Sequence, residues 1–275
     1  MSVRNPLVSV IIPSLDGYRQ GNVPKLLEDL SKQSFQDFEV HVVKGISPCS
    51  KAHNVGAKLA KGEILVFFDD DVRLGTEKVV ENLIKPLIED KTIGITGASQ
   101  LIPPDSNEFQ KHCVKILYRS QFPIVNKITE TDMVTHAGMA ILKKLYLELG
   151  GENGNLIRGD DPEFRYRVRQ SGHRIVVVPN TWVFHPMYRN LGELLKARFQ
   201  HGVGAAHDSR YFPNLIFEVP PPDVTDFVPR RSLPFRIIRF IVRLIRLLLT
   251  FQLIGFLANL SYAIGFSIGL FKRYK

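Results

Sequence analysis

Short apolar runs alternate with amphipathic stretches through most of the chain. Residues 7–12 (LVSVII) are rich in β-branched side chains and end at Pro13, which predicts a buried parallel strand followed by a loop. The same reasoning predicts strands over 38–43, 63–68, 93–98, 137–142 and 174–178, and helices over 23–33, 50–60, 77–89, 143–149 and 162–170. Alternation at this spacing predicts an α/β fold with a mostly parallel sheet and helices on both faces.

One stretch interrupts this alternation. Residues 101–135 mix polar and apolar positions, and the pattern assigns no helix or strand there, only a turn at Pro103-Pro104. The helix expected from Pro162 is preceded by Asp160 and Asp161, either of which is a good N-cap.

The C-terminal fifth of the chain differs in character. Residues 213–234 are rich in proline, the composition of a linker, and separate an expected domain over 1–212 from helices over 235–275. Arginines then recur at helical spacing among apolar residues, which predicts a basic amphipathic helix suited to an anionic bilayer surface: Arg236, Arg239, Arg243 and Arg246.

Residues 247–271 carry no formal charge, and a bilayer span takes roughly 20 apolar residues. Polar residues dilute the stretch, and Gly255, Gly265 and Gly269 are positions at which a helix could break. Three arrangements therefore remain open: one span, an in-plane or re-entrant pair of amphipathic helices, or an ordinary packed helix of a soluble protein.

The charge balance points to an anionic partner. Lys and Arg number 36 and Asp and Glu 27, a surplus of nine that is concentrated near the C-terminus among aliphatic residues. This favours a membrane, and because the chain has no recognisable nucleic-acid-reading motif, no nucleic-acid partner is expected. Cys49 and Cys113 form no CxxC pair, and the N-terminus shows no secretory signal, so we expect a membrane-associated protein whose catalytic part is cytoplasmic.

Asp69, Asp70 and Asp71 follow the predicted strand over 63–68 directly. Adjacent carboxylates repel one another, and a bound Mn²⁺ or Mg²⁺ ion removes that cost. In sheets of this kind ligands bind beyond the carboxyl ends of the strands, which is where the three aspartates are expected. A solvated acidic turn or a helix cap is the alternative interpretation.

Four segments in order carry a resemblance to a known family. They are VSVIIPS, KAHNVGAKLAKGEILVFFDDDV, THAGMAILKKLYLELGG and GDDPEFRYRVRQSGHRIVVVP, within roughly residues 7–212. Together they resemble the family 2 inverting glycosyltransferases, which have the GT-A fold. The resemblance implies a nucleotide-sugar donor and a Mn²⁺ or Mg²⁺ cofactor.

The resemblance also implies residue roles on the donor side. Asp69 and Asp71 match the two aspartates of the DxD motif, with Asp71 as the metal ligand, Asp69 near the donor's ribose and Asp70 in the variable middle position. His185 matches a position that often binds metal or phosphate, although a lone histidine is as often a packing residue.

On the acceptor side, Asp161 matches the aspartate of the family's ED pair and would be the general base. Asp160 stands where Glu is usual and is expected to position the acceptor or to cap the helix. Gly138 and Met139, in the THAGMA segment, are further acceptor-side candidates.

The nucleotide pocket is less certain to assign. Its candidates are loop and helix-start residues: Pro13, Ser14, Lys44, Lys51 and Asn54. Many family members carry an aspartate that reads the base where this chain has Lys44, so a UDP-sugar is favoured but the nucleotide stays open. The basic segment KARFQHGVGAAH (196–207) either meets phosphates or the acceptor, or is an exposed basic helix.

The sequence thus predicts a metal-dependent inverting glycosyltransferase that acts on a hydroxyl or phosphate acceptor at a membrane, in lipid-linked or cell-surface glycan synthesis. The alternative is a catalytically silent, membrane-attached nucleotide-binding scaffold of the same fold. The sugar, the acceptor and the oligomeric state are not predicted.

Overall fold

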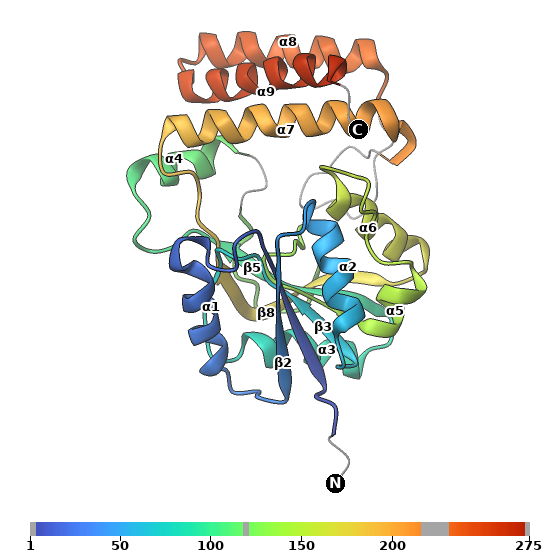
Figure 1. The fold of residues 1–275 in the computed structure, drawn as a ribbon. Coiled ribbons are helices and arrows are strands. Elements are labelled where there is room, and N and C mark those ends of the chain that lie inside the picture. The colour runs from blue at the N-terminus through green and yellow to red at the C-terminus, as the bar shows by residue number, and fades with distance from the viewer. Residues whose placement is uncertain (1–3, 118–120, 216–230, 273–275) are drawn as a thin grey trace.

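The computed structural model describes residues 4–117, 121–215 and 231–272 (Figure 1). Its strands are β1 (Val8–Ser14), β2 (Phe38–Lys44), β3 (Ile64–Phe67), β4 (Arg73–Leu74), β5 (Ile93–Leu101), β6 (Thr129–Glu130), β7 (Met139–Leu142) and β8 (Arg174–Phe184). Its helices are α1 (Asn22–Ser31), α2 (Cys49–Leu59), α3 (Val79–Glu89), α4 (Glu108–Ile116), α5 (Lys143–Glu148), α6 (Asp160–Gln170), α7 (Leu191–Tyr211), α8 (Leu233–Leu249) and α9 (Leu253–Phe271), with short 3-10 turns at Arg19–Gly21 and Pro213–Leu215.

One mixed sheet forms the centre of the protein, in the order β2-β1-β3-β7-β5-β8-β4, with β6 paired to β8. The pairs β1/β2, β1/β3 and β5/β8 are parallel. Strand β7 runs antiparallel to both neighbours, because the connection from β5 begins and ends at the same edge of the sheet. The predicted α/β architecture is confirmed, with this antiparallel strand as the main departure from a parallel sheet.

Apolar residues of the sheet pack against helices on both faces, as the alternating pattern predicts. On one face, Leu26 of α1 and Leu83 of α3 join the side chains of β1 and β3 in a buried cluster. On the other, Ala52 of α2, Tyr146 of α5 and Phe164 of α6 do the same. These clusters hold the strand ends in place, and the candidate site residues follow from those ends.

The structure assigns one open stretch and corrects one local prediction. The stretch 101–135, to which the sequence assigned no helix or strand, contains β6 and α4, and Asn107 and Gln110 form a reciprocal capping box at the start of α4. The predicted N-cap of α6 is wrong. Neither Asp160 nor Asp161 is an N-cap: α6 begins at Asp160, and the capping position is Gly159, in a left-handed conformation with φ 82°. The two carboxylates therefore lie within the first turn of α6 and are not engaged in capping.

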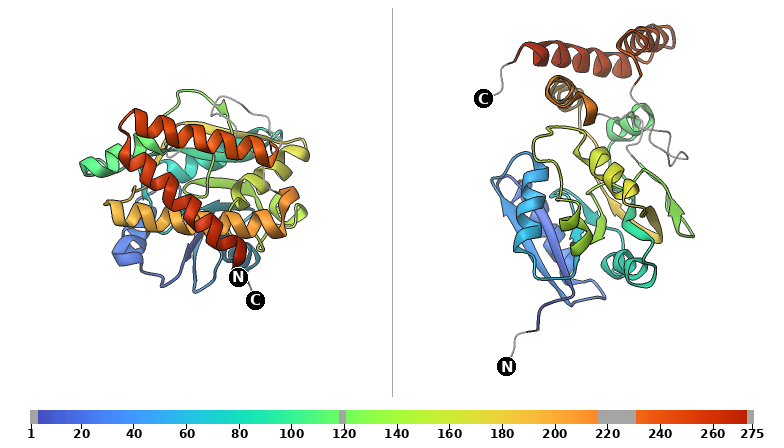
Figure 2. Two further views of the ribbon diagram at one scale, coloured as in Figure 1. Left: turned by 90° about the horizontal axis from the view of Figure 1, so that it is seen from above. Right: turned by 90° about the vertical axis from the view of Figure 1, so that its right-hand side faces the viewer.

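Helices α7, α8 and α9 form a layer over the carboxyl edge of the sheet (Figures 1 and 2). The glycines of α9 do not break it. A Cβ at Gly265 would collide with the backbone of Phe199 in α7, and one at Gly202 would collide with the backbone of Tyr262 in α9. The glycines therefore allow close backbone contact between α7 and α9.

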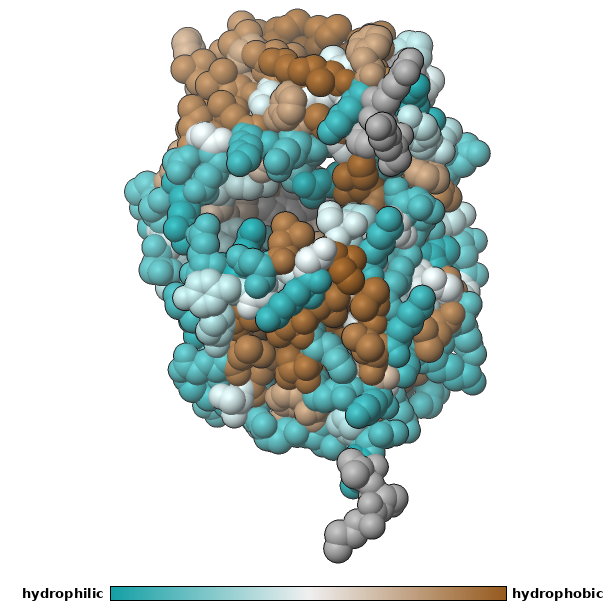
Figure 3. Space-filling model, in the orientation of Figure 1, coloured by the Kyte–Doolittle hydropathy of each residue, from teal (hydrophilic) through white to brown (hydrophobic). Residues whose placement is uncertain are grey.

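The outer surface of this layer is apolar (Figure 3). Among the described residues, α9 is the one helix long and apolar enough to cross a membrane, which on length and composition alone is weak evidence for a span. Since α7 falls within the predicted 1–212 domain and packs on α9, the two predicted parts lie in contact; the division into domains stays a prediction.

Candidate active site

The aspartate triplet, Asp69 to Asp71, leaves the end of β3 at the carboxyl edge of the sheet. His185, which follows β8 directly, points its Nε2 at this triplet, 3.3 Å from Asp71 Oδ1 and 3.8 Å from Asp69 Oδ2. The sheet thus brings together residues more than a hundred positions apart in the sequence, and the predicted metal ligands Asp71 and His185 are direct neighbours.

Charge in the triplet is only partly balanced. Burial, aided by the charge of Asp71, raises the pKa of Asp69, and burial also raises the pKa of Asp70. Burial would raise the pKa of Asp71 as well, but its hydrogen bond to His185 and the charge of that ring hold it below the usual value. An oxygen-rich set with unbalanced negative charge fits a hard divalent cation such as Mn²⁺ or Mg²⁺.

Arg19 also contacts the triplet, and the sequence analysis missed it. Its guanidinium lies 3.3 Å from Asp70 Oδ1 and 3.4 Å from Asp71 Oδ2. Its backbone adopts φ 47°, a left-handed conformation stabilised by Asp16, whose Oδ1 accepts hydrogen bonds from the amides of Tyr18 and Arg19. The Asp16-Gly17 pair was the available signal for a tight turn here.

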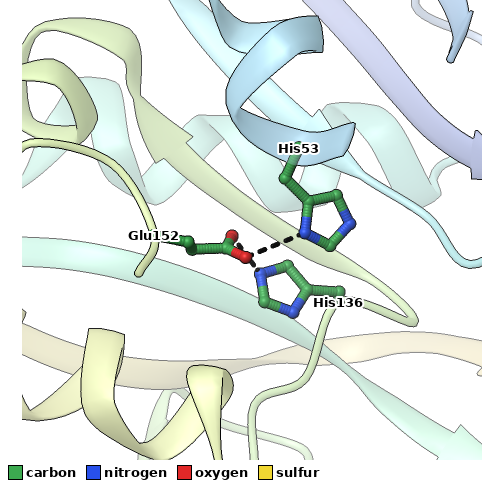
Figure 4. Close-up of side chains that lie close together, drawn as sticks. All are labelled: His53, His136 and Glu152. Atoms are coloured by element: carbon green, nitrogen blue, oxygen red, sulfur yellow. Dashed lines mark hydrogen bonds and ion pairs between the residues drawn. The ribbon is translucent and has the colours of Figure 1, made fainter. Parts of the chain in front are cut away.

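A second cluster, which we call the histidine chain, extends from the start of α6 into the protein: Asp161, His136, Glu152 and His53. His136 Nδ1 donates to Asp161 Oδ1, and His136 Nε2 donates to Glu152 Oε1 at 2.7 Å. His53 Nδ1 donates to Glu152 Oε2 at 2.9 Å (Figure 4). The two imidazole rings stack with centroids 4.2 Å apart.

Burial strengthens the electrostatic interactions between the groups of the histidine chain. The side chains of His53 and Glu152 are 1% and 0% exposed, and that of His136 is 7% exposed. Burial disfavours a charged His136, yet the charges of Glu152 and Asp161 outweigh it and raise the pKa of His136 well above its ordinary value. Conversely, His136 lowers the pKa values of Glu152 and Asp161 despite their burial. His136 is therefore an imidazolium between two carboxylates.

Asp160 behaves differently from its neighbour. Burial, together with the negative charges of Asp161 and Glu152, raises the pKa of Asp160 to about 7. The adjacent carboxylates thus have opposite tendencies, since Asp161 stays ionised and Asp160 retains a proton near neutrality. Such a separation is common where acid and base roles are divided between two groups.

His53, His136 and Glu152 each place one ligand atom close enough to share a metal ion. However, each Glu152 oxygen already accepts a hydrogen bond from one ring (Figure 4). A cation would have to displace both protons from a fully buried position. The distances describe a hydrogen-bonded chain, so this cluster fits a metal ion less well than the aspartate triplet does.

The predicted nucleotide candidates fall into two groups. Ser14 and Lys44 end the paired strands β1 and β2, and the Lys44 side chain lies against Gly17. Pro13 is buried beside them, and Lys51 is exposed on α2. By contrast, Asn54 uses its side chain within the protein, accepting from Tyr146 Oη at 2.7 Å and donating to the Glu152 carbonyl at 2.7 Å.

The predicted acceptor-side pair, Gly138 and Met139, is buried at the start of β7. A Cβ at Gly138 would contact Ala98 and Val183 at 3.1 and 3.2 Å, and Met139 is 2% exposed within the core. Neither residue lines the cavity described below, and their acceptor-side role stays a prediction.

A cavity of about 930 Å³ separates the carboxyl edge of the sheet from the helical layer. Figure 3 shows the hollow, rimmed by hydrophilic residues, beneath the apolar helices. Arg19, Asp71 and His185 line it on the sheet side. On the helical side its walls include Arg158, Lys196, Arg198, His201 and Arg243, so the basic segment 196–207 faces this cavity.

Comparison with known proteins assigns the family. The family described as "Glycosyltransferase like family 2" matches residues 6–204. The chain belongs to glycosyltransferase family 2. This family 2 chain is also 25% identical over 201 residues to an uncharacterized glycosyltransferase of Haemophilus influenzae, an alignment that covers 60% of the chain and 62% of the relative.

Two solved structures share its fold. A mannosyltransferase, PcManGT from Pyrobaculum calidifontis, in complex with GDP-Man and Mn²⁺ superposes with TM-score 0.58 at 16% identity, covering 98% of the family 2 chain and 88% of its own. GalNAc-T7 with UDP, GalNAc and Mn²⁺ gives TM-score 0.53 at 14% identity, with coverages of 75% and 52%. These likenesses confirm the predicted GT-A fold.

Proposed function

We propose that this family 2 protein is a metal-dependent inverting glycosyltransferase, which transfers a sugar from a nucleoside-diphosphate donor, with UDP favoured, to an acceptor at a membrane surface. The observation that carries the proposal is the aspartate triplet with His185 at the carboxyl edge of a GT-A sheet, opening into the cavity. The solved relatives named above hold nucleotide ligands together with Mn²⁺, which supports the same class of donor and cofactor here.

On the donor side, Asp71 and His185 would hold the metal ion. Asp69 would contact the ribose, and Asp70 would complete the acidic surface. A bound Mn²⁺ or Mg²⁺ ion would neutralise negative charge on the departing diphosphate. Arg19, which touches both Asp70 and Asp71, is placed to exchange these carboxylates for phosphate oxygens when the donor binds.

On the acceptor side, Asp161 would be the general base. His136 Nδ1 binds Asp161 Oδ1, and this fixes the carboxylate and keeps it ionised. Asp161 Oδ2 is then the atom that takes the proton from the acceptor hydroxyl as that oxygen attacks the anomeric carbon. Asp160, in the same helical turn, would position the acceptor.

The helical layer would attach the protein to the membrane. Helix α8 exposes Ile238, Ile241 and Val242 along with its arginines, the composition of an interfacial helix. Because α9 lies along α7 and buries its glycine face there, we propose that both α8 and α9 lie in the membrane plane on the cytoplasmic side, with α9 not spanning it.

The first test is nucleotide binding by detergent-purified protein, with UDP, GDP and dTDP, with and without Mn²⁺, in wild type and Asp71→Ala. We expect Mn²⁺-dependent binding of one nucleotide that the variant loses. Turnover of the matching nucleotide-sugar should then give a product of inverted anomeric configuration by NMR.

The competing function is a silent nucleotide-binding scaffold. Nucleotide binding without turnover of any donor would favour it, whereas a retained anomeric configuration would reject the inverting mechanism. Turnover that Asp161→Asn abolishes while nucleotide binding persists would reject the scaffold.

A further inference from the structure

The helical side of the cavity gathers positive charge from three separate elements. Arg158 comes from the loop before α6, Arg198 from α7 and Arg243 from α8, and all three line the cavity. His201, one turn after Arg198, lines it too. The cluster therefore exists only when the helical layer is docked over the sheet.

These charges lack carboxylate partners. Within residues 4–117, 121–215 and 231–272, no ion pair joins Arg158, Arg198 or Arg243 to an acidic side chain. The Nε of Arg198 is buried without a hydrogen-bond partner among those residues, and its guanidinium lies over the Tyr262 ring at 4.9 Å. By contrast, the buried guanidinium of Arg165 lies 2.9 Å from Asp132.

The charges of Arg158 and Arg243 act on the buried guanidinium of Arg198. Burial, together with the charges of Arg243 and Arg158, lowers the pKa of Arg198. Burial and the charges of Arg158 and Arg198 lower the pKa of His201 to about 3, so this ring stays neutral. An anion with several oxygens would satisfy the guanidinium groups together, and phosphate has the geometry that arginine binds best.

The position of the cluster indicates where such an anion comes from. The sheet side of the cavity carries Asp71, His185 and Arg19, where the donor diphosphate is expected. Gly255, Ala258 and Asn259 of α9 line the same cavity, and the Arg198 guanidinium lies over the ring of Tyr262, also in α9. A phosphate bound beside these residues would lie directly beneath helices whose outer surface is apolar (Figure 3).

We propose that Arg158, Arg198 and Arg243 form a binding site for the phosphate or diphosphate headgroup of an amphiphilic acceptor, whose apolar chain leaves along α8 and α9 into the membrane. This inference rests on the proposed function, because it names the class of acceptor for the same cavity. It assigns recognition of the phosphate to the three arginines, and it leaves to Asp161 the removal of the proton from a hydroxyl that the acceptor carries beyond its phosphate.

The test measures binding of dodecyl phosphate to protein in nonionic detergent, by calorimetric titration, against dodecanol and inorganic phosphate. Wild type should bind dodecyl phosphate at least ten times more tightly than either comparison compound. Arg198→Gln and Arg243→Gln should each weaken this binding about tenfold or more, the loss of roughly one charge-assisted contact. Mn²⁺-dependent nucleotide binding should be unchanged in both variants.

Arg246→Gln is the matched control, since Arg246 makes the same charge change on the same helix but does not line the cavity. It should bind dodecyl phosphate within twofold of wild type. An equal loss in Arg246→Gln would overturn the proposal in favour of general attraction to the helix. If wild type binds inorganic phosphate as tightly as dodecyl phosphate, the apolar chain contributes nothing, and the proposal that the anion belongs to a lipid is overturned.

Loss of nucleotide binding in Arg198→Gln, with dodecyl phosphate binding intact, would reassign the arginines to the donor diphosphate. These outcomes are separate from failure of the proposed function. If Asp71→Ala retains nucleotide binding, the donor site is wrong whatever the arginine variants do.

Discussion

The aspartate triplet and the histidine chain both concentrate carboxylates at the same edge of the sheet, but they balance charge differently. In the triplet, the partners are Arg19, with a side chain 54% exposed, and His185, 3.3 Å from Asp71. In the histidine chain, Asp161 and Glu152 share a buried imidazolium. The first cluster is thus incomplete without a ligand, while the second is complete within the protein. The triplet is therefore arranged to bind a ligand, whereas the histidine chain holds its own groups in a fixed geometry before any ligand binds.

The largest effect should follow removal of a charge from the incomplete cluster. Asp71→Asn should lower turnover by about a thousandfold, as loss of a principal electrostatic contact to the transition state does. The free energy of unfolding should fall only modestly, because the lowered pKa of Asp71 means that His185 and Arg19 stabilise its ionised form in the folded state. Turnover and urea unfolding in detergent measure both.

Asp105→Asn, an identical change at an exposed position, is the control for Asp71→Asn and should match wild type. A strongly destabilised Asp71→Asn protein would mean that the triplet is structural. The two clusters would then not differ in their need for a ligand.

The next effect concerns the complete cluster. His136→Gln keeps at most one hydrogen bond and removes the positive charge between two carboxylates. Breaking a buried ion pair costs about 3–5 kcal/mol, so the free energy of unfolding should fall by that order. Turnover per folded molecule should also fall, about ten- to a hundredfold and in kcat rather than KM, because Asp161 loses its orientation.

His112→Asn, on the exposed surface of α4, should change neither stability nor turnover and is the comparison for His136→Gln. Loss of stability with an unaltered kcat would show that His136 serves folding alone and does not position Asp161.

Asp160 gives a pH-dependent contrast with Asp161. Its pKa rises from about 3.8 to about 7, so the folded state binds its proton more tightly than the unfolded state does. Ionising Asp160 therefore opposes folding, and this cost grows between pH 4 and pH 7. Asp160→Asn should raise the free energy of unfolding by about 1–3 kcal/mol at pH 8 and hardly at all at pH 4.

Thermal or urea unfolding at pH 4, 6 and 8 would measure this trend for Asp160→Asn. Because the pKa of Asp161 is lowered, Asp161→Asn should instead lose stability, and more at pH 8 than at low pH. The same sign for both variants would contradict the division of roles between the two aspartates.

The smallest effect is expected at Arg19. Exposed ion pairs contribute about 0–1 kcal/mol, so Arg19→Gln should leave stability nearly unchanged. Since Arg19 occupies oxygens of Asp70 and Asp71, its removal should tighten Mn²⁺ binding a few-fold in the absence of nucleotide and weaken binding of the nucleoside diphosphate. Titration with Mn²⁺ alone and then with UDP separates the two effects; equal weakening of both would place Arg19 in the fold rather than at the donor.

Much of the fold could be predicted because local runs of apolar residues indicate where the strands lie. Apolar runs at 7–12 and 63–68 form buried strands, as predicted, and the aspartates that follow the second run are at the predicted edge. Helix α4 was missed, although Asn107 and Gln110 have the spacing of a capping box. Phe109, Cys113 and Ile116 also recur at helical spacing, so both signals of α4 are present in the sequence.

The histidine chain could not be predicted in the same way. Its four members lie on α2, on two separate loops and at the start of α6, and no local pattern couples them. In the sequence, a histidine or glutamate in a loop cannot be told from an ordinary polar residue. Only the fold brings these side chains together in a buried position. The close contact between α7 and α9 was not predicted either, although Gly265 and Gly269 have the GxxxG spacing that favours close helix packing.

The close contact at Gly202 and Gly265 has a further consequence for the reaction. Tightly apposed backbones leave little freedom to tilt or slide, so α9 is held at a constant height above the sheet. If the apolar layer rests on a bilayer, the carboxyl edge of the sheet would be held at a fixed distance from the membrane surface. Acceptors would then be selected by how far their reactive hydroxyl stands from the lipid, in addition to their chemical identity.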